Sequence, residues 1–486
     1  MLKESEILRF IKEDEVSSKK KKAKLGQKYY EAEHDILEFR MFYYDKDGQL
    51  VEDNIRSNSR ICHPFFTELV DQQVQYMLST KDRYIRSDNT ELQARLDEYF
   101  DDDFTAELSE CLTGAITKGF EYIHAYKTKE DKLAFECADS LGVIEVRAKD
   151  TDDGCQYVIY WYIDRIEKGQ KEIKRIKVAD DKQTWFYVQV DDNTIQLDES
   201  EKTNPRPHYV YKKDGSDETY WSPLGFVPFF RLDNNKKQTS GLKPIKTLID
   251  DYDLMACGLS NNLKDFDTPI HVVKGFNGDN LDELHVNLKT KKVIGVDSEG
   301  DVDIRTIDVP YQARETKLNL DEKNIYRFGM GFNSAQLGDG NITNIVIKSR
   351  YALLDLKCNK LEIRLKQFLK KIVQVVLNEI NKKDGTGYTM KEVWFDFTKE
   401  IITNAQDNAQ IELIDAQKKQ IEINILLSLA NALGDELVIQ NICEVLDLEY
   451  EEIKDEIPKA DEDIGDVEKM LDETVPNDDL GGDLIE

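Results

Sequence analysis

Two helical patterns separated by a stretch of alternating residues dominate the middle of the chain. From Ser240 to Phe266 the apolar side chains recur at intervals of three and four residues, the spacing of one helix face. Ser240 is a suitable cap and Pro244 fits only a first turn, so the helix is expected to begin between them. Thr268-Pro269 is expected to end it. From Tyr311 to Phe332 apolar residues recur every seventh position, which predicts a returning, antiparallel helix.

The segment between these two helices alternates apolar and polar residues, as β-strands do. Glycines separate its short runs, and Glu299-Gly300 is expected to separate the last run from the one before it. The expected strands are His271–Val273, Leu284–Leu288, Val293–Val296 and Val302–Ile307. The pattern predicts a small β module at the tip of a helical hairpin, which is not the plan of a compact enzyme core.

A polar stretch and a long helix follow. Asn333–Asn344 contains almost no apolar residue, so we expect a mobile loop. Ile345–Ile380 predicts a helix of 36 residues. Between Asn344 and Lys371, eight lysines and arginines stand against two acids. We interpret this basic face as one that pairs with acids of a neighbouring element or subunit. Direct contact with DNA phosphate is the alternative.

The N-terminal half predicts a hairpin, three helices and a sheet. Tyr43-Tyr44, Asp47-Gly48 and Leu50-Val51 together form a hairpin signature. Helical spacing and then alternating runs follow, at Ile61–Leu78, Glu91–Tyr99 and Phe104–Phe120 for the helices and from Tyr122 to Trp221 for the strands. We expect an antiparallel sheet packed on the preceding helices.

The C-terminal part predicts a strand, two helices and a tail. Val393–Phe397 is the expected strand, and Ala405–Leu433 and Glu436–Leu446 are the expected helices. Glu451–Glu486 carries fifteen acids and three lysines. Such a segment cannot bury enough apolar surface to fold, so we expect it to be largely disordered in solution.

Composition excludes several classes of protein. The net charge of −30 argues against a protein that coats nucleic acid, because phosphate contact requires Lys and Arg. No apolar run approaches the ~20 residues that span a bilayer, and the first residues do not resemble a signal peptide, so we expect no membrane contact. The seven scattered cysteines, without a CxxC pair, are typical of reduced thiols.

No catalytic chemistry stands out in the sequence. There is no P-loop, HExxH, GxSxG or GxGxxG motif. The six histidines are scattered without metal-ligand spacing, and His63, beside Pro64, is interpreted as a structural histidine. We therefore expect no enzyme activity, no cofactor and no metal site.

Several residue blocks occur in a characteristic order over some 300 residues. They are Asn58–Phe65, Leu69–Gln72 and Tyr76–Leu78, then Phe226–Phe230, Asn234-Asn235 and Leu242–Asp250, and finally Asn341–Asn344, Ser349–Tyr351 and Leu353-Leu354. In this order and spacing the chain resembles the portal (head-to-tail connector) proteins of tailed bacteriophages, of the SPP1 type. Each block is weak alone, and the set is specific.

The resemblance implies an α+β portal fold with wing, stem, clip and crown, assembled as a ring. The implied segments are an N-terminal wing part (1–239), a first stem helix (240–268), a clip (269–310), a second stem helix (311–332), a tunnel loop (333–344), a long wing helix with a closing strand (345–400), a helical crown (401–450) and an acidic tail (451–486).

The implied function is mechanical. A ring of about twelve copies at one capsid vertex admits and later releases double-stranded DNA, which it contacts weakly and without sequence specificity. The implied partners are the terminase large subunit, the head-tail adaptor, the major capsid protein and the scaffolding protein. The implied location is the virion, with the host cytoplasm during assembly.

The resemblance also suggests candidate contact residues. The DNA-facing candidates in the loop are Asn333, Gln336, Asp339 and Asn341. Lys323 and Arg327 on the returning helix are candidates to line the tunnel. Candidates for partner contacts in the clip are Lys289, Lys291 and Lys292.

Two other classes of protein share these helices and this acidity. An interaction scaffold without a channel predicts no closed ring. A nucleic-acid-processing enzyme without a recognisable motif predicts an activity that one carboxylate or histidine substitution abolishes.

Overall fold

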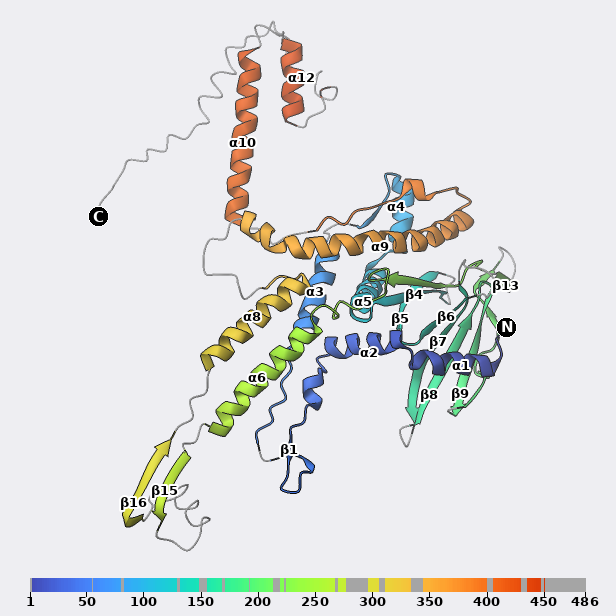
Figure 1. Ribbon diagram of the computed structural model, residues 1–486. Coiled ribbons are helices and arrows are strands. Elements are labelled where there is room, and N and C mark those ends of the chain that lie inside the picture. The colour runs from blue at the N-terminus through green and yellow to red at the C-terminus, as the bar shows by residue number, and fades with distance from the viewer. Residues whose placement is uncertain are drawn as a thin grey trace. The chain divides into compact units, whose positions relative to one another are not determined.

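The computed structural model of the chain combines helices and antiparallel sheets, which agrees with the α+β class (Figure 1). It describes residues 2–54, 56–79, 83–128, 132–147, 155–167, 171–191, 193–212, 219–222, 224–266, 270–276, 296–305, 311–333, 344–399, 405–429, 435–446 and 450. Two compact units are present: Met1–Gly340 with Val346–Ile401, and Asn341–Ile345 with Ile402–Glu486.

The first unit opens with helices and a hairpin. These are α1 (Glu4–Glu15), α2 (Ser18–Tyr30), η1 (Asp35–Glu38), β1 (Phe42–Tyr44) and β2 (Leu50–Glu52). The predicted hairpin is confirmed, with Tyr43 opposite Val51. Its turn forms because the Asp45 carboxylate accepts hydrogen bonds from the backbone of Asp47 and Gln49, while Gly48 adopts a φ of +76°.

Three capped helices follow, namely α3 (Phe65–Met77), α4 (Thr90–Asp97) and α5 (Asp102–Lys118). The Asn89 and Asp101 side chains accept the first free N–H groups of α4 and α5, and Gly119 ends α5 in a left-handed conformation. The sequence placed these helices correctly, except that Ile61 to Pro64 lies outside α3.

The predicted antiparallel strands are confirmed, but they form several sheets. The strands are β3 (Ile85–Arg86), β4 (Phe120–Lys127), β5 (Leu133–Ala138), β6 (Val143–Arg147), β7 (Cys155–Glu167), β8 (Lys171–Ala179), β9 (Gln183–Asp191), β10 (Thr194–Leu197), β11 (Arg206–Pro207), β12 (Tyr209–Lys212), β13 (Thr219–Ser222), β14 (Phe229–Asp233) and β17 (Trp394–Phe395). One sheet runs β10-β9-β8-β7-β6, with β11 on β9, and another runs β14-β4-β5. The remaining strands of this group pair as β12 with β13 and β17 with β3.

Different helices cover the two larger sheets. Ile7 and Ile11 of α1 pack against Ile159 and Ile176 of the larger sheet. The smaller sheet joins α5 in the main core, as expected from the order of the elements. The pairings of β14 with β4 and of β17 with β3 join segments far apart in the sequence, and no local pattern signalled them.

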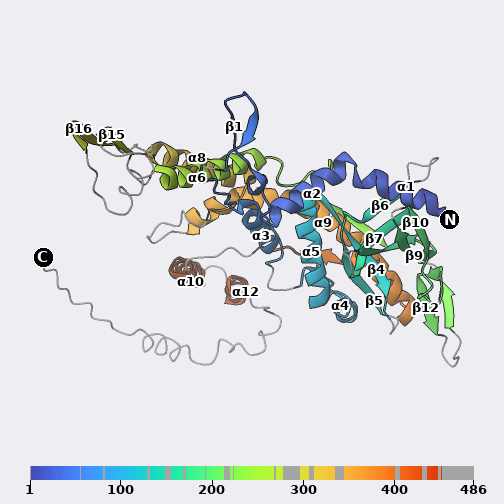
Figure 2. The same ribbon diagram turned by 90° about the horizontal axis from the view of Figure 1, so that it is seen from below.

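The two predicted central helices are α6 (Lys246–Phe266) and α8 (Tyr311–Gly329), which lie side by side (Figures 1 and 2). The expected start of the first helix between Ser240 and Pro244 is wrong, because residues 241–245 form turns and α6 begins at Lys246. β15 (Ile270–Phe276) and β16 (Val296–Arg305) pair antiparallel between them. β16 is one strand that runs through Glu299-Gly300, so the expected separation into two strands is not seen. The pairing is nevertheless interrupted at this point. Asp301 lies opposite Lys274 and Val296 lies opposite Phe276, so residues 297–300 stand against Gly275 alone. The expected strand Leu284–Leu288 lies outside the described residues.

The long helix is confirmed as α9 (Asn344–Asp384), four residues longer at its C-terminal end than expected. Its second half carries one fully buried face and forms the centre of the main core, with Leu365, Leu369, Ile372, Val376 and Ile380. Because α3, α5 and the smaller sheet pack around this face, α9 organises the first unit. The second unit contains α10 (Ala405–Ser428) and α12 (Asp435–Val445), at the two predicted helical stretches. No helix among the described residues could span a membrane.

Helix α2 approaches α5 so closely that only glycine fits at residue 26. A Cβ there would lie 1.9 Å from the carbonyl oxygen of Thr117. Alanine at Gly258, inside α6, would meet only the flexible end of Arg314 at 3.1 Å.

We expect Gly26→Ala to lower the free energy of unfolding by about 1–3 kcal/mol, because overpacking outweighs alanine's better helix propensity. Gly258→Ala is the matched control and should be neutral or stabilising by up to about 1 kcal/mol. Denaturant titration of both variants measures the difference. Equal effects at the two positions would contradict the close packing of α2 on α5.

Candidate functional site

The helix pair α6 and α8 is held at one end and exposed at the other. Ile249 of α6 and Ile325 of α8 are fully buried in the main core, whereas Leu263 and Tyr311, near the other ends, are 54% and 57% exposed. Lys317 of α8 bonds to Asp251 of α6 and to Asp321 of its own helix, which ties the pair together. The β15–β16 hairpin follows at the exposed ends (Figure 1).

An extended segment, Ser57–His63, runs along α6, and we call it the strap. Four alternate backbone N–H groups of the strap donate to side chains four residues apart on α6: Ser57 to Asp265 at 3.2 Å, Ser59 to Asn261 at 2.7 Å, Ile61 to Cys257 at 3.3 Å, and His63 to Asp253 at 2.9 Å. The match is geometric, because two extended residues advance about 6.6 Å and four helical residues about 6 Å.

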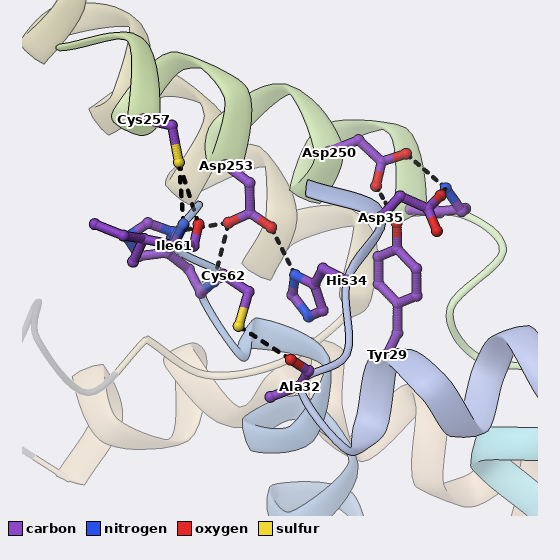
Figure 3. Close-up of polar contacts among 11 residues, drawn as sticks. Tyr29, Ala32, His34, Asp35, Ile61, Cys62, Asp250, Asp253 and Cys257 are labelled. Atoms are coloured by element: carbon purple, nitrogen blue, oxygen red, sulfur yellow. Dashed lines mark hydrogen bonds and ion pairs between the residues drawn. The ribbon is translucent and has the colours of Figure 1, made fainter. Parts of the chain in front are cut away.

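The inner end of the strap closes on Asp253, a fully buried carboxylate of α6 (Figure 3). His34 approaches one of its oxygens with Nδ1 at 2.6 Å, and His63 approaches the other at 2.7 Å. Burial by itself raises the pKa of Asp253, but the hydrogen bonds from the two histidines outweigh it and hold that pKa below its usual range. The ring of Tyr29 stacks on His34 at 4.5 Å.

A second set of bonds ties α6 to the N-terminal helices. Lys246 donates to Asp35 and Asp250 at 2.7 Å each, and the Tyr29 hydroxyl donates to Asp250 (Figure 3). Cys62 of the strap donates its thiol to the carbonyl of Ala32 at 3.1 Å. The base of α6 is therefore fastened to the chain on both sides of the β1–β2 hairpin.

Helix α3 holds the end of α8. The Gln72 amide accepts from the backbone N–H of Phe332 at 3.0 Å and donates to its carbonyl at 2.7 Å. The Tyr326 hydroxyl donates to Glu68 at 2.5 Å. Gly329 and Gly331 admit the Leu69 side chain, since a Cβ at either would lie within 2.6 Å of it. The chain is thus clamped immediately before the predicted loop.

The basic face of α9 differs from the expectation in one respect. Among the residues that the structure describes, Lys357 does not pair with an acid as expected. It donates to the carbonyl of Gly329 at 2.9 Å and so caps the C-terminal end of α8. Burial lowers the pKa of Lys357 to about 8. Lys366 pairs with Glu362 of the same helix, and Lys399 also reaches Glu362.

Three of the nine predicted contact residues lie among the residues that the structure describes, namely Asn333, Lys323 and Arg327. The buried Asn333 side chain donates to Glu322 of α8 at 2.8 Å. Lys323 and Arg327 are exposed on α8, and the Arg327 guanidinium lies 6.0 Å from the Phe328 ring. The other candidates lie outside the described residues: Gln336, Asp339, Asn341, Lys289, Lys291 and Lys292.

Sequence reasoning missed the convergence of His34 and His63 on Asp253. The histidines are 219 and 190 residues from that aspartate, so no local spacing linked them. A signal existed in the polar side chains at every fourth position of α6 from Asp253 to Asp265. In the described part of the chain, no group of three or more His, Cys, Asp or Glu is arranged to hold a metal ion.

A family model described as "Phage portal protein, SPP1 Gp6-like" matches residues 10–463. The chain belongs to the phage portal protein family. It is 29% identical to the portal protein of Bacillus phage SPP1 over 388 residues, 79% of this chain and 75% of that protein. It is 24% identical to the portal protein of Clostridium phage phiCD119 over 403 residues, 78% and 85% of the two chains. Portal proteins are structural components of the virion.

Three of the residue blocks that carried the portal resemblance lie at the contacts that fasten α6 and α8. Asn58–Phe65 is most of the strap with the start of α3, and Leu69–Gln72 is the part of α3 that holds α8. Leu242–Asp250 leads into the base of α6. These three blocks therefore supply contacts that fasten the helix pair.

We expect Asp253→Ala to lower the free energy of unfolding by about 3 kcal/mol at pH 7, because it leaves buried partners of the carboxylate unpaired. Asp265→Ala removes an exposed acceptor at the other end of the strap and should cost less than about 1 kcal/mol. Urea titration of the three proteins measures both effects. Equal losses would show that the strap bonds are equivalent along α6.

The Asp253 effect should depend on pH with a definite sign. A carboxyl whose pKa is depressed by folding stabilises the protein above its unfolded pKa of about 4, and this stabilisation is lost as the pH falls through the folded pKa. The free energy of unfolding of the wild type should therefore exceed that of Asp253→Ala by its full difference at pH 7. This difference should shrink progressively below about pH 4. If the difference in unfolding free energy between the two proteins grew on acidification, Asp253 could not be the ionised, stabilising carboxylate described here.

We expect Gln72→Leu to lower the free energy of unfolding by about 1–3 kcal/mol, because it leaves the backbone N–H and carbonyl of Phe332 unpaired. Gln75→Leu, an exposed position of the same helix, is the control and should change it by less than about 0.5 kcal/mol. Hydrogen exchange at the Phe332 amide should accelerate in Gln72→Leu alone. Unchanged protection there would exclude the clamp.

Proposed function

We propose that about twelve copies of this portal-family chain form a closed ring at one capsid vertex, through which double-stranded DNA is packaged and ejected. The family match over residues 10–463 is the observation that carries the proposal. The helix pair supports it, because α6 and α8 leave large apolar side chains exposed that a neighbouring copy would cover, such as Leu263 and Leu320.

In this proposal the helix pair is the stem, with boundaries 240–268 and 311–332. The clip is 269–310 and includes β15 and β16. The N-terminal part to residue 239 and the long helix with its closing strand, 345–400, form the wing, while 401–450 forms the crown. The segment 451–486 is the acidic tail.

The loop 333–344 faces the tunnel in this arrangement. Gln336, Asp339 and Asn341 are its candidates for weak DNA contact, and Asn333 holds the start of the loop to α8 through Glu322. Lys323 and Arg327 are exposed candidates for the stem wall. Because the chain is strongly acidic, its net charge of −30 would repel phosphate and keep the duplex away from the wall.

The partners follow from the same proposal. The clip, with Lys289, Lys291 and Lys292, meets the terminase large subunit during packaging and the head-tail adaptor afterwards. The outer body meets the major capsid and scaffolding proteins. The ring assembles in the host cytoplasm and resides at the portal vertex of the virion.

Negative-stain electron microscopy of the purified full chain tests the ring. We expect end-on views with a central hole and a rotational symmetry near twelve, because a heterologous interface that closes on rotation gives a cyclic assembly. Monomers or dimers at micromolar concentration, or open filaments, would contradict the proposal, and filaments would favour a scaffold without a channel.

A further inference from the structure

The β1–β2 hairpin exposes apolar side chains on both of its faces. Tyr44, Leu50 and Phe42 share one face and are 74%, 60% and 52% exposed. Tyr43 and Val51 share the other face and are also exposed. An isolated two-stranded hairpin is at best marginally stable in water, and clustered exposed aromatic residues mark interaction surfaces. The hairpin therefore requires a partner.

The contacts of Asp253 and of the strap with α6 determine where this hairpin lies. Its two strands connect to η1, beside the base of α6, and to the strap, whose outer end bonds to Asp265. The hairpin consequently lies next to α6, and Figure 1 shows α8 on the other side of that helix. The strap and α8 also use different positions of α6, since Lys317 of α8 bonds to Asp251, which is not one of the strap's partners.

Charge excludes nucleic acid as the partner. The hairpin carries Asp45, Asp47 and Glu52 against one lysine, Lys46, so it repels phosphate. A protein surface with exposed apolar side chains fits it better. The chain provides such a surface on α8, where Leu320 and Phe328 lie about two turns apart and are 53% and 51% exposed. The exposed Arg327 lies beside them on the helix surface, so in this contact it would face the acidic hairpin of the neighbouring copy and would not line the tunnel.

Neighbouring copies of this chain can cover both the β1–β2 hairpin and the exposed apolar side chains of α8. A closed ring uses heterologous contacts, in which two different patches of one subunit meet their counterparts on the subunits at either side. The hairpin and helix α8, which carries Leu320 and Phe328, are two such surfaces, and Figure 1 shows α6 between the hairpin and α8. We propose that the β1–β2 hairpin packs, through Phe42, Tyr44 and Leu50, on this α8 surface of the neighbouring copy.

This inference rests on the proposed ring, and it names a contact within it. Photo-cross-linking tests the contact directly in the full chain. Tyr44 is replaced by benzoylphenylalanine, and rings are assembled from equal amounts of nitrogen-15-labelled and unlabelled chains. We expect cross-linked peptides that join residue 44 to α8 and that combine one labelled with one unlabelled partner. The same replacement at Ile166, an exposed position of β7, should give no link to α8.

A closed ring in which residue 44 links only within its own chain, to another segment of its neighbour, or to nothing would overturn this inference and leave the ring intact. Failure of the wild-type chain to form any ring would overturn the proposed function itself. The two failures are therefore distinguishable.

Serine substitutions measure the strength of the contact. Tyr44→Ser with Leu50→Ser should raise the chain concentration needed for half-assembly at least ten-fold, because both apolar anchors are removed. Ile166→Ser removes an equally exposed apolar side chain elsewhere and should leave assembly unchanged. Sedimentation velocity gives the ring fraction, and the circular dichroism of the unassembled chain shows that it remains folded. Unchanged assembly of the double variant would overturn the inference.

Discussion

The buried carboxylate of Asp253 is the contact on which the arrangement of the helix pair depends. A buried charge is tolerated only when its oxygens are fully hydrogen-bonded, and here the partners come from both ends of the segment that contains the β1–β2 hairpin. One side chain therefore fixes His34, the strap and α6 relative to one another. The remaining strap bonds continue this alignment along α6, with decreasing burial toward Asp265.

A few contacts also fix α8, which α3 and α9 hold at one end. Gln72 pairs with the backbone of Phe332, and Lys357 completes the last carbonyls of the helix. The inner ends of α6 and α8 are thus rigidly attached to a core built on α9, while the outer ends carry exposed apolar side chains. In the proposed ring, this construction gives each subunit a core-packed base and an exposed apolar surface that a neighbouring copy can cover.

In the proposed ring, the strong negative charge of the chain limits how its copies can associate. Like charges repel, so contacts between identical acidic subunits depend on apolar side chains and on local pairing more than on net attraction. The exposed residues of the β1–β2 hairpin and of α8 are of this kind. The same acidity is compatible with a protein that DNA passes without adhering to it.

The sequence by itself determined the elements that depend on neighbouring residues. Apolar spacing located α6, α8 and α9, and Asp47-Gly48 located the turn of the hairpin, because periodicity and turn chemistry act within one segment. Only the tertiary structure decided which segments meet. The convergence of His34 and His63 on Asp253, the pairing of β14 with β4, and the role of Lys357 at the end of α8 depend on packing between distant segments, which leaves no period in the sequence.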